Sequence, residues 1–183
     1  MSDDRIPGDL NPDADLEAMK REIAELRRMV ARPDVAEFPH LGSTNGSVFV
    51  VMPFGVEDLQ VVYDDFVKPT VERRCGLQCV RGDDLFGSGV IIDDVLKAIR
   101  GSTLVIADLT GQNANVFYEV GIAHAVEVPV LLMAQSLDDV PFDVRHRRVL
   151  LYDYTPRGCK RLEAHVEEHV RKMLEISRKP NQG

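Results

Sequence analysis

Positive charge is scarce in this sequence. It contains 22 lysines and arginines against 30 aspartates and glutamates, which gives a formal net charge of -8 at pH 7. A surface that binds a nucleic-acid polymer needs clustered cations to neutralise phosphates, so we expect no such partner. A small nucleotide is still compatible with this balance, because backbone N–H groups can hold its phosphates.

Long hydrophobic runs are also missing. No apolar stretch approaches the roughly 20 residues that a membrane-spanning helix needs. The N-terminal residues Met-Ser-Asp-Asp-Arg lack the charged and then apolar layout of an export signal. We therefore expect a cytoplasmic protein with no membrane partner.

Cysteine is rare, and its spacing carries little chemistry. Cys75, Cys79 and Cys159 make an odd number and form neither a CxxC nor a CxxH pair. Such a set is typical of reduced, structural thiols in the cytosol. Because no metal-ligand spacing occurs either, we expect no metal and no cofactor.

The first 46 residues differ from the rest of the 183-residue chain. Residues 1–13 are rich in Asp, Pro and Gly and are interpreted as a disordered lead. Residues 14–31 are predicted to form an amphipathic, coiled-coil-like helix, and residues 32–46 are predicted to form a linker. The apolar residues of the predicted helix recur in alternating steps of three and four, at Leu16, Met19, Ile23, Leu26 and Val30. The helix either docks on the domain or makes the protein a homo-oligomer, and both interpretations stay open.

Residues 47–183 alternate between strand and helix patterns. Short apolar runs predict strands at 48–52, 77–80, 104–107, 129–133 and 149–152. Helical periodicity predicts helices at 59–74, 90–99, 116–126 and 159–177. This alternation predicts an α/β domain with a five-stranded parallel, flavodoxin-like sheet of order 2-1-3-4-5 and helices on both faces.

In a sheet of this order the strand order reverses between the first and third strands, and ligands bind outside the carboxyl ends of the strands at this switch point. Pro53, Phe54 and Gly55 follow the first strand. Residues 108–115 follow the third strand, and residues 83–89 follow the second. We therefore expect a substrate site at this edge.

The most informative stretch is 104–121. Its apolar run ends abruptly at Asp108, and a polar, turn-forming loop follows. A helical pattern then opens, and its first turns carry Glu119 beside the aromatic Tyr118. Two acids thus follow one strand end, at the place where an α/β sheet binds ligands.

Several motifs between residues 47 and 155 converge on this edge. They read VMPF at 51–54, RGDD at 81–84, GSGVI at 87–91, IADLTG at 106–111 and NANVFYEVGIAHA at 113–125. On these motifs the chain resembles the nucleoside 2-deoxyribosyltransferase-like superfamily, which shares its sheet architecture with TIR (Toll/interleukin-1 receptor) domains. That superfamily includes transferases, nucleotide hydrolases, NAD-cleaving enzymes and non-catalytic signalling members.

The resemblance implies that Glu119 acts on the anomeric carbon of a ribosyl group. Breaking an N-glycosidic bond builds oxocarbenium character on the sugar, which a nearby carboxylate stabilises or attacks. The helix dipole is expected to help keep Glu119 ionised. Asp108 and Asp83 are candidates for a second acid that serves the leaving base or orients sugar hydroxyls, and each can instead cap a loop.

Candidates for binding the sugar and base lie beside these acids. Asn113 and Asn115 can hydrogen-bond hydroxyls or phosphate, and both are also common turn and N-cap residues. Tyr118 or Phe54 can stack on a base.

Candidates for binding a phosphate lie in three segments. Ser88 and Gly89 belong to a loop that leads into a helix, where backbone N–H groups can receive a phosphate. Arg81, or the arginines within 145–148, can supply positive charge.

These features predict an enzyme that cleaves the N-glycosidic bond of NAD or of a nucleoside or nucleotide, by hydrolysis or base transfer. NAD would then be a substrate and not a cofactor. The alternative is a non-catalytic TIR-like module that binds nucleotides and assembles through its N-terminal helix.

Overall fold

The computed structural model describes residues 46–82 and 92–178. Several predictions fall outside these residues. They are those for the lead at 1–13, the helix at 14–31 and the linker at 32–45, and those for Asp83, Ser88 and Gly89.

Within the described residues, five parallel strands form one sheet. In spatial order they are β2 (Gln78–Arg81), β1 (Ser47–Val51), β3 (Leu104–Asp108), β4 (Val130–Ala134) and β5 (Val149–Leu151). The predicted flavodoxin-like order 2-1-3-4-5 is confirmed. Each strand begins and ends within one residue of its predicted bounds.

The strands are continuous apolar runs because both faces of the sheet are covered. Successive side chains of a strand point to opposite faces. Val48 and Val50 of β1 join one core cluster, and Phe49 and Val51 join the other. All of β1 and β3 is buried, as expected for central strands of a parallel sheet.

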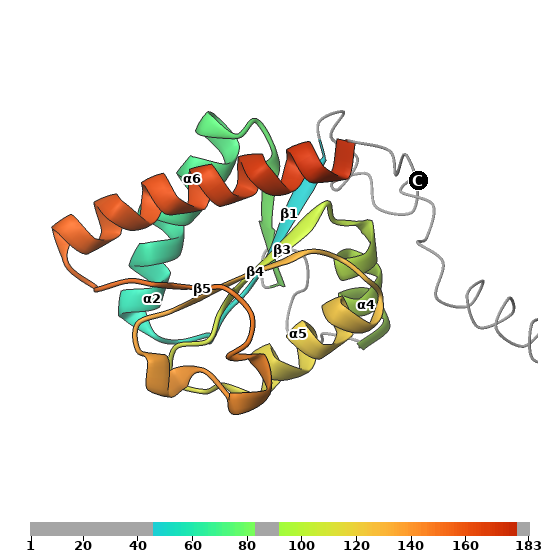
Figure 1. The fold of residues 1–183 in the computed structure, drawn as a ribbon, viewed down its shortest axis with the longest axis horizontal. Coiled ribbons are helices and arrows are strands. Elements are labelled where there is room, and N and C mark those ends of the chain that lie inside the picture. The colour runs from blue at the N-terminus through green and yellow to red at the C-terminus, as the bar shows by residue number, and fades with distance from the viewer. Residues whose placement is uncertain (1–45, 83–91, 179–183) are drawn as a thin grey trace, which may run out of the picture. The chain divides into compact units, whose positions relative to one another are not determined.

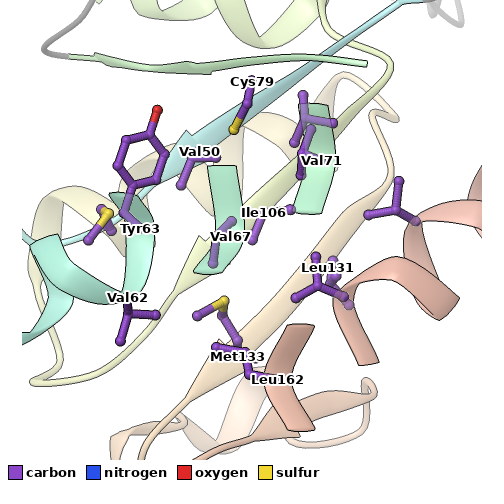
Figure 2. Close-up of a cluster of buried hydrophobic side chains, with 14 of the residues drawn as sticks. Val50, Val62, Tyr63, Val67, Val71, Cys79, Ile106, Leu131, Met133 and Leu162 are labelled. Carbon is purple, nitrogen blue, oxygen red and sulfur yellow. The ribbon is translucent and has the colours of Figure 1, made fainter. Parts of the chain in front are cut away.

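Helices form a layer on each face of the sheet (Figure 1). One layer consists of α2 (Glu57–Val61), its continuation in the π-helical segments η2 (Val62–Val67) and η3 (Thr70–Arg74), and α6 (Pro156–Arg178). The other layer consists of α4 (Ile92–Gly101) and α5 (Ala114–Ala125). Figure 2 shows the core beneath the first layer, where Val67 of η2 and Leu162 of α6 pack with strand residues such as Ile106.

The helix predicted at 59–74 has widened turns. Pro69 lies between η2 and η3, and a proline inside a helix has no N–H to donate to the preceding turn. The amide of Cys75 then donates to the Thr70 carbonyl at 3.1 Å, five residues back. Gly76 ends the helix with a φ of 69°, the left-handed conformation that glycine adopts without strain.

The connection from β4 to β5 has no α-helix of its own. It contains two 3-10 turns, η4 (Leu137–Asp139) and η5 (Phe142–Val144). Among the helices described, none has the length and apolar character that crossing a bilayer requires.

Candidate functional site

The predicted site edge coincides with the switch point of the sheet. β1 pairs with β2 on one side and with β3 on the other, so the order in which strands are added to the sheet reverses between β1 and β3. The predicted site residues that the structure describes lie in two segments. One is the loop after β1, and the other runs from the end of β3 into the first turns of α5.

Asp108, the last residue of β3, is a buried and fully hydrogen-bonded acid. Its Oδ1 accepts from the Thr110 backbone amide at 3.0 Å and from the Thr110 hydroxyl at 2.6 Å. Its Oδ2 accepts from the Tyr152 hydroxyl at 2.7 Å. Burial raises the pKa of Asp108, although these hydrogen bonds oppose the shift. Only 2% of the residue is exposed, so its geometry suits an organiser of the edge.

Tyr152 was not a predicted site residue, although it anchors this network. The sequence pattern predicts Tyr152 as the last residue of the apolar run that forms the last strand. A tyrosine at a buried position needs a partner for its hydroxyl, and that requirement is the signal that points to a polar group at a neighbouring strand end. Gln135, after β4, adds to the network by donating its Nε2 to the Tyr152 hydroxyl at 3.4 Å.

The loop between β3 and α5 is held in a defined, partly left-handed conformation. Gly111 and Gln112 have φ values of 76° and 54°. The Gly111 amide donates to Asp139 Oδ1 at 3.1 Å, and Gln112 Nε2 donates to the Asp138 carbonyl at 2.6 Å. Because η4 provides both acceptors, the β4–β5 connection positions the start of α5.

Asn113 is the N-cap of α5. Its side-chain oxygen accepts from the Asn115 amide at 2.9 Å and from the Val116 amide at 3.4 Å. These bonds satisfy donors that a helix start leaves without partners. Of the two roles open to Asn113, the structure therefore shows the cap. Asn115 has an exposed side chain in the first turn of α5.

Glu119 is the predicted central carboxylate, and its environment is unusual for an acid. It lies in the second turn of α5, next to the buried stripe of Val116, Val120 and Ala123. Its side chain is half-buried, and among residues 46–82 and 92–178 no hydrogen-bond or ion-pair partner is found for it. Burial raises the pKa of Glu119 to about 7.

This pKa shift corrects the expectation that the helix dipole keeps Glu119 ionised. Dipole stabilisation falls off within the first turn of a helix. Glu119 lies beyond that turn, since α5 begins at Ala114. Desolvation of the carboxylate therefore outweighs the dipole, and the neutral acid is substantially populated near pH 7.

The loop after β1 presents one aromatic ring to solvent. Pro53 is buried, Phe54 is 57% exposed, and Gly55 forms the turn with a φ of 74°. Tyr118 is also 57% exposed, on the surface of α5. Both aromatic side chains proposed for base stacking are thus accessible.

Two of the predicted phosphate-binding arginines have other contacts. Arg81, at the end of β2, is only 6% exposed, and its Nη1 donates to Gln60 Oε1 at 2.8 Å. Arg145 donates to two carbonyls of its own connection, those of Val140 at 2.9 Å and Leu137 at 3.4 Å. Both side chains therefore stabilise the local structure.

A cavity of about 10 Å³ lies next to Asp108, beneath the widened helix. Val50, Met52, Tyr63 and Met133 are among the residues that line it. This volume holds one water molecule at most, whereas small-molecule pockets measure roughly 300–1,000 Å³. The cavity is therefore too small for a nucleotide-sized molecule.

Within the described parts of the chain, no group of three or more His, Cys, Asp or Glu side chains is arranged to hold a metal ion. In comparisons with known proteins, the sequence matches no family model and no curated protein.

Proposed function

We propose that this protein cleaves the N-glycosidic bond of NAD or of a nucleoside or nucleotide, with Glu119 as the central carboxylate. In this reaction the bond between C1′ and the base nitrogen breaks. The base leaves with the bonding electrons. A purine or pyrimidine base also gains a proton, whereas the nicotinamide of NAD leaves as a neutral molecule without one. Water, which gives up a proton, or a second base attaches to C1′. Neither a metal nor a redox cofactor is needed to balance these changes.

One observation carries the proposal: a half-buried carboxyl in the helix that follows β3, whose pKa is raised to about 7. An acid whose pKa lies near the working pH can accept or release a proton readily. In its ionised form it can stabilise or attack the electron-poor anomeric carbon, as carboxylates do in glycoside hydrolysis.

The surroundings of Glu119 support the same chemistry. Asp108 and Asn113 have their oxygens committed to hydrogen bonds that shape the loop before α5. Their role is therefore to position the helix that carries Glu119. The exposed rings of Phe54 and Tyr118 offer surfaces on which a base can stack.

The proposal is tested by incubating the full chain with NAD and with panels of nucleosides, deoxynucleosides and their 5′-monophosphates. Free base is followed by chromatography over a range of protein concentrations. We expect base release from at least one of these substrates. Absence of release from the whole panel at every concentration would contradict the proposal.

The Glu119→Gln variant tests the assigned residue. It keeps the size of the side chain and removes the ionisable group, so base release should fall below detection while the circular dichroism spectrum is unchanged. The matched control is Glu127→Gln, because Glu127 is exposed just past the other end of α5. An unimpaired Glu119→Gln protein would remove Glu119 from the mechanism.

A further inference from the structure

Arg81 lies between two aromatic rings at the carboxyl edge of the sheet. Its Cζ is 4.5 Å from the centroid of the Tyr63 ring and 5.8 Å from that of the Phe54 ring. Its Nη1 also donates to Gln60 Oε1. The guanidinium is therefore fixed from the side of α2 and η2, and its contact with Phe54 is at the outer limit of cation–π range.

The Phe54 ring contacts Arg81 and is largely exposed. A Cβ added to Gly82 would lie 3.7 Å from Phe54 Cζ, so a side chain at this position would contact the ring. Gly55, the next residue, has a φ of 74°. In all, 57% of Phe54 remains exposed. The buried Arg81 guanidinium thus contacts an aromatic side chain that is largely exposed to solvent.

A ring that is held in place loses little conformational freedom when a ligand stacks on it, and such preorganisation raises affinity. We propose that Arg81 is a positioning residue that holds Phe54 as a stacking platform for the planar base of the substrate. This inference rests on the proposed function and deepens it, because it requires a heteroaromatic leaving group.

The test measures binding without turnover. The probes are AMP, CMP and nicotinamide mononucleotide, with ribose 5-phosphate as the matched probe that lacks a base. Calorimetry should show that at least one nucleotide binds more tightly than ribose 5-phosphate. For that nucleotide, Phe54→Ala should weaken binding roughly 5- to 150-fold, the range found for stacking one base on an aromatic side chain.

Substitutions at Arg81 then separate positioning from a general structural role. Arg81→Met should weaken nucleotide binding, and combining it with Phe54→Ala should add little, because the arginine acts through the ring. Binding of ribose 5-phosphate should not change in any of these variants. Arg81→Lys provides a second variant in case the methionine protein does not fold, since it keeps the charge but lacks the planar group.

The matched control is Lys68→Met. The Lys68 ammonium lies 5.7 Å from the centroid of the Tyr63 ring, so this change removes a cation from the same aromatic without involving Phe54. Nucleotide binding should not change in this variant.

Three results would overturn the platform. They are additive losses in the double variant, no effect of Phe54→Ala, or equal binding of all nucleotides and ribose 5-phosphate. The platform and the glycosidase proposal can fail separately. Ring-dependent binding without base release would contradict only the proposed reaction, whereas base release with additive variants would contradict only the platform.

Discussion

The Tyr152 hydroxyl donates a hydrogen bond to Asp108 Oδ2 at a distance of 2.7 Å. This contact joins the end of β3 to the residue that follows β5, across the intervening strand β4. Burial and the neighbouring Asp108 charge both raise the pKa of Tyr152, so the phenol keeps its proton and remains a donor. The edge that carries the candidate site is therefore braced by side chains from strands that are not neighbours.

Replacing Tyr152 with Phe should destabilise the protein by about 1–3 kcal/mol. The change leaves Asp108 Oδ2 buried without its donor, and a buried acceptor that loses its partner costs roughly that much. Urea denaturation measures the difference. The control is Tyr118→Phe, because Tyr118 is exposed and should lose almost nothing. Equal stability of the two variants would show that the hydrogen bond contributes no net stability.

The strands of the sheet can be predicted from the sequence, whereas the hydrogen bond between Tyr152 and Asp108 cannot. Central strands such as β1 and β3 are buried on both faces, so their composition alone marks them. Right-handed crossovers leave few topologies, and the flavodoxin-like order is a common one for five parallel strands. The pairing of Asp108 with Tyr152 is not visible in the same way, because it joins residues 44 positions apart through the register of three strands.

The individual site residues were harder to predict for local reasons. The sequence offers Arg81 as a source of charge for a phosphate, but its guanidinium lies 4.5 Å from the centroid of the Tyr63 ring and 5.8 Å from that of the Phe54 ring. Glu119 was expected to stay ionised because it follows a helix start, but burial raises its pKa. In both cases the sequence identifies the position in the fold, whereas the side-chain environment depends on packing between distant segments.

The raised pKa of Glu119 predicts a pH-dependent stability difference. The folded protein binds the Glu119 proton more tightly than the unfolded chain does, since the pKa rises from 4.5 to about 7. Its contribution to stability is therefore fully present below pH 4.5 and is lost as the pH rises through 7. The Glu119→Gln variant, which never ionises, should gain stability relative to the wild type over this window.

We expect this gain to be of the order of 2 kcal/mol between pH 4.5 and pH 8. The full pKa shift, at about 1.36 kcal/mol per pKa unit, would imply a larger gain. We expect less because contact with solvent screens the Glu119 charge. Denaturation of both proteins at several pH values measures the difference in their free energies of unfolding. Groups other than Glu119 titrate in both proteins, so their contribution cancels in this difference. A difference that does not vary with pH would place the pKa of Glu119 near its ordinary value.

The same pKa sets the pH dependence of the proposed reaction. If the ionised carboxylate acts at C1′, kcat/KM should rise about tenfold per pH unit below pH 7 and level off above it. The measurement is the initial rate of base release at low substrate concentration between pH 5 and 9. A profile that falls through pH 7 would instead assign Glu119 the role of a general acid.

Two glycines in helices predict opposite effects of the same substitution. Gly158, in the first turn of α6, is buried, and a Cβ added there would lie 2.1 Å from the Asp153 carbonyl oxygen. That oxygen belongs to the backbone and cannot move aside as a flexible side chain would. Gly121, in the middle of α5, is exposed, and a Cβ added there would have no atom within 4 Å.

Gly121→Ala should therefore stabilise the protein by about 0.5–1 kcal/mol, the difference in helix propensity between glycine and alanine. Gly158→Ala should destabilise it by more than that, because overpacking forces the start of α6 away from the loop after β5 and typically costs about 1–3 kcal/mol. Both helices gain the same methyl group, so thermal denaturation of the two variants compares packing directly. A stabilising Gly158→Ala would mean that the chain relaxes at Asp153 without cost, and that glycine at this position is not required by the close approach of the two backbones.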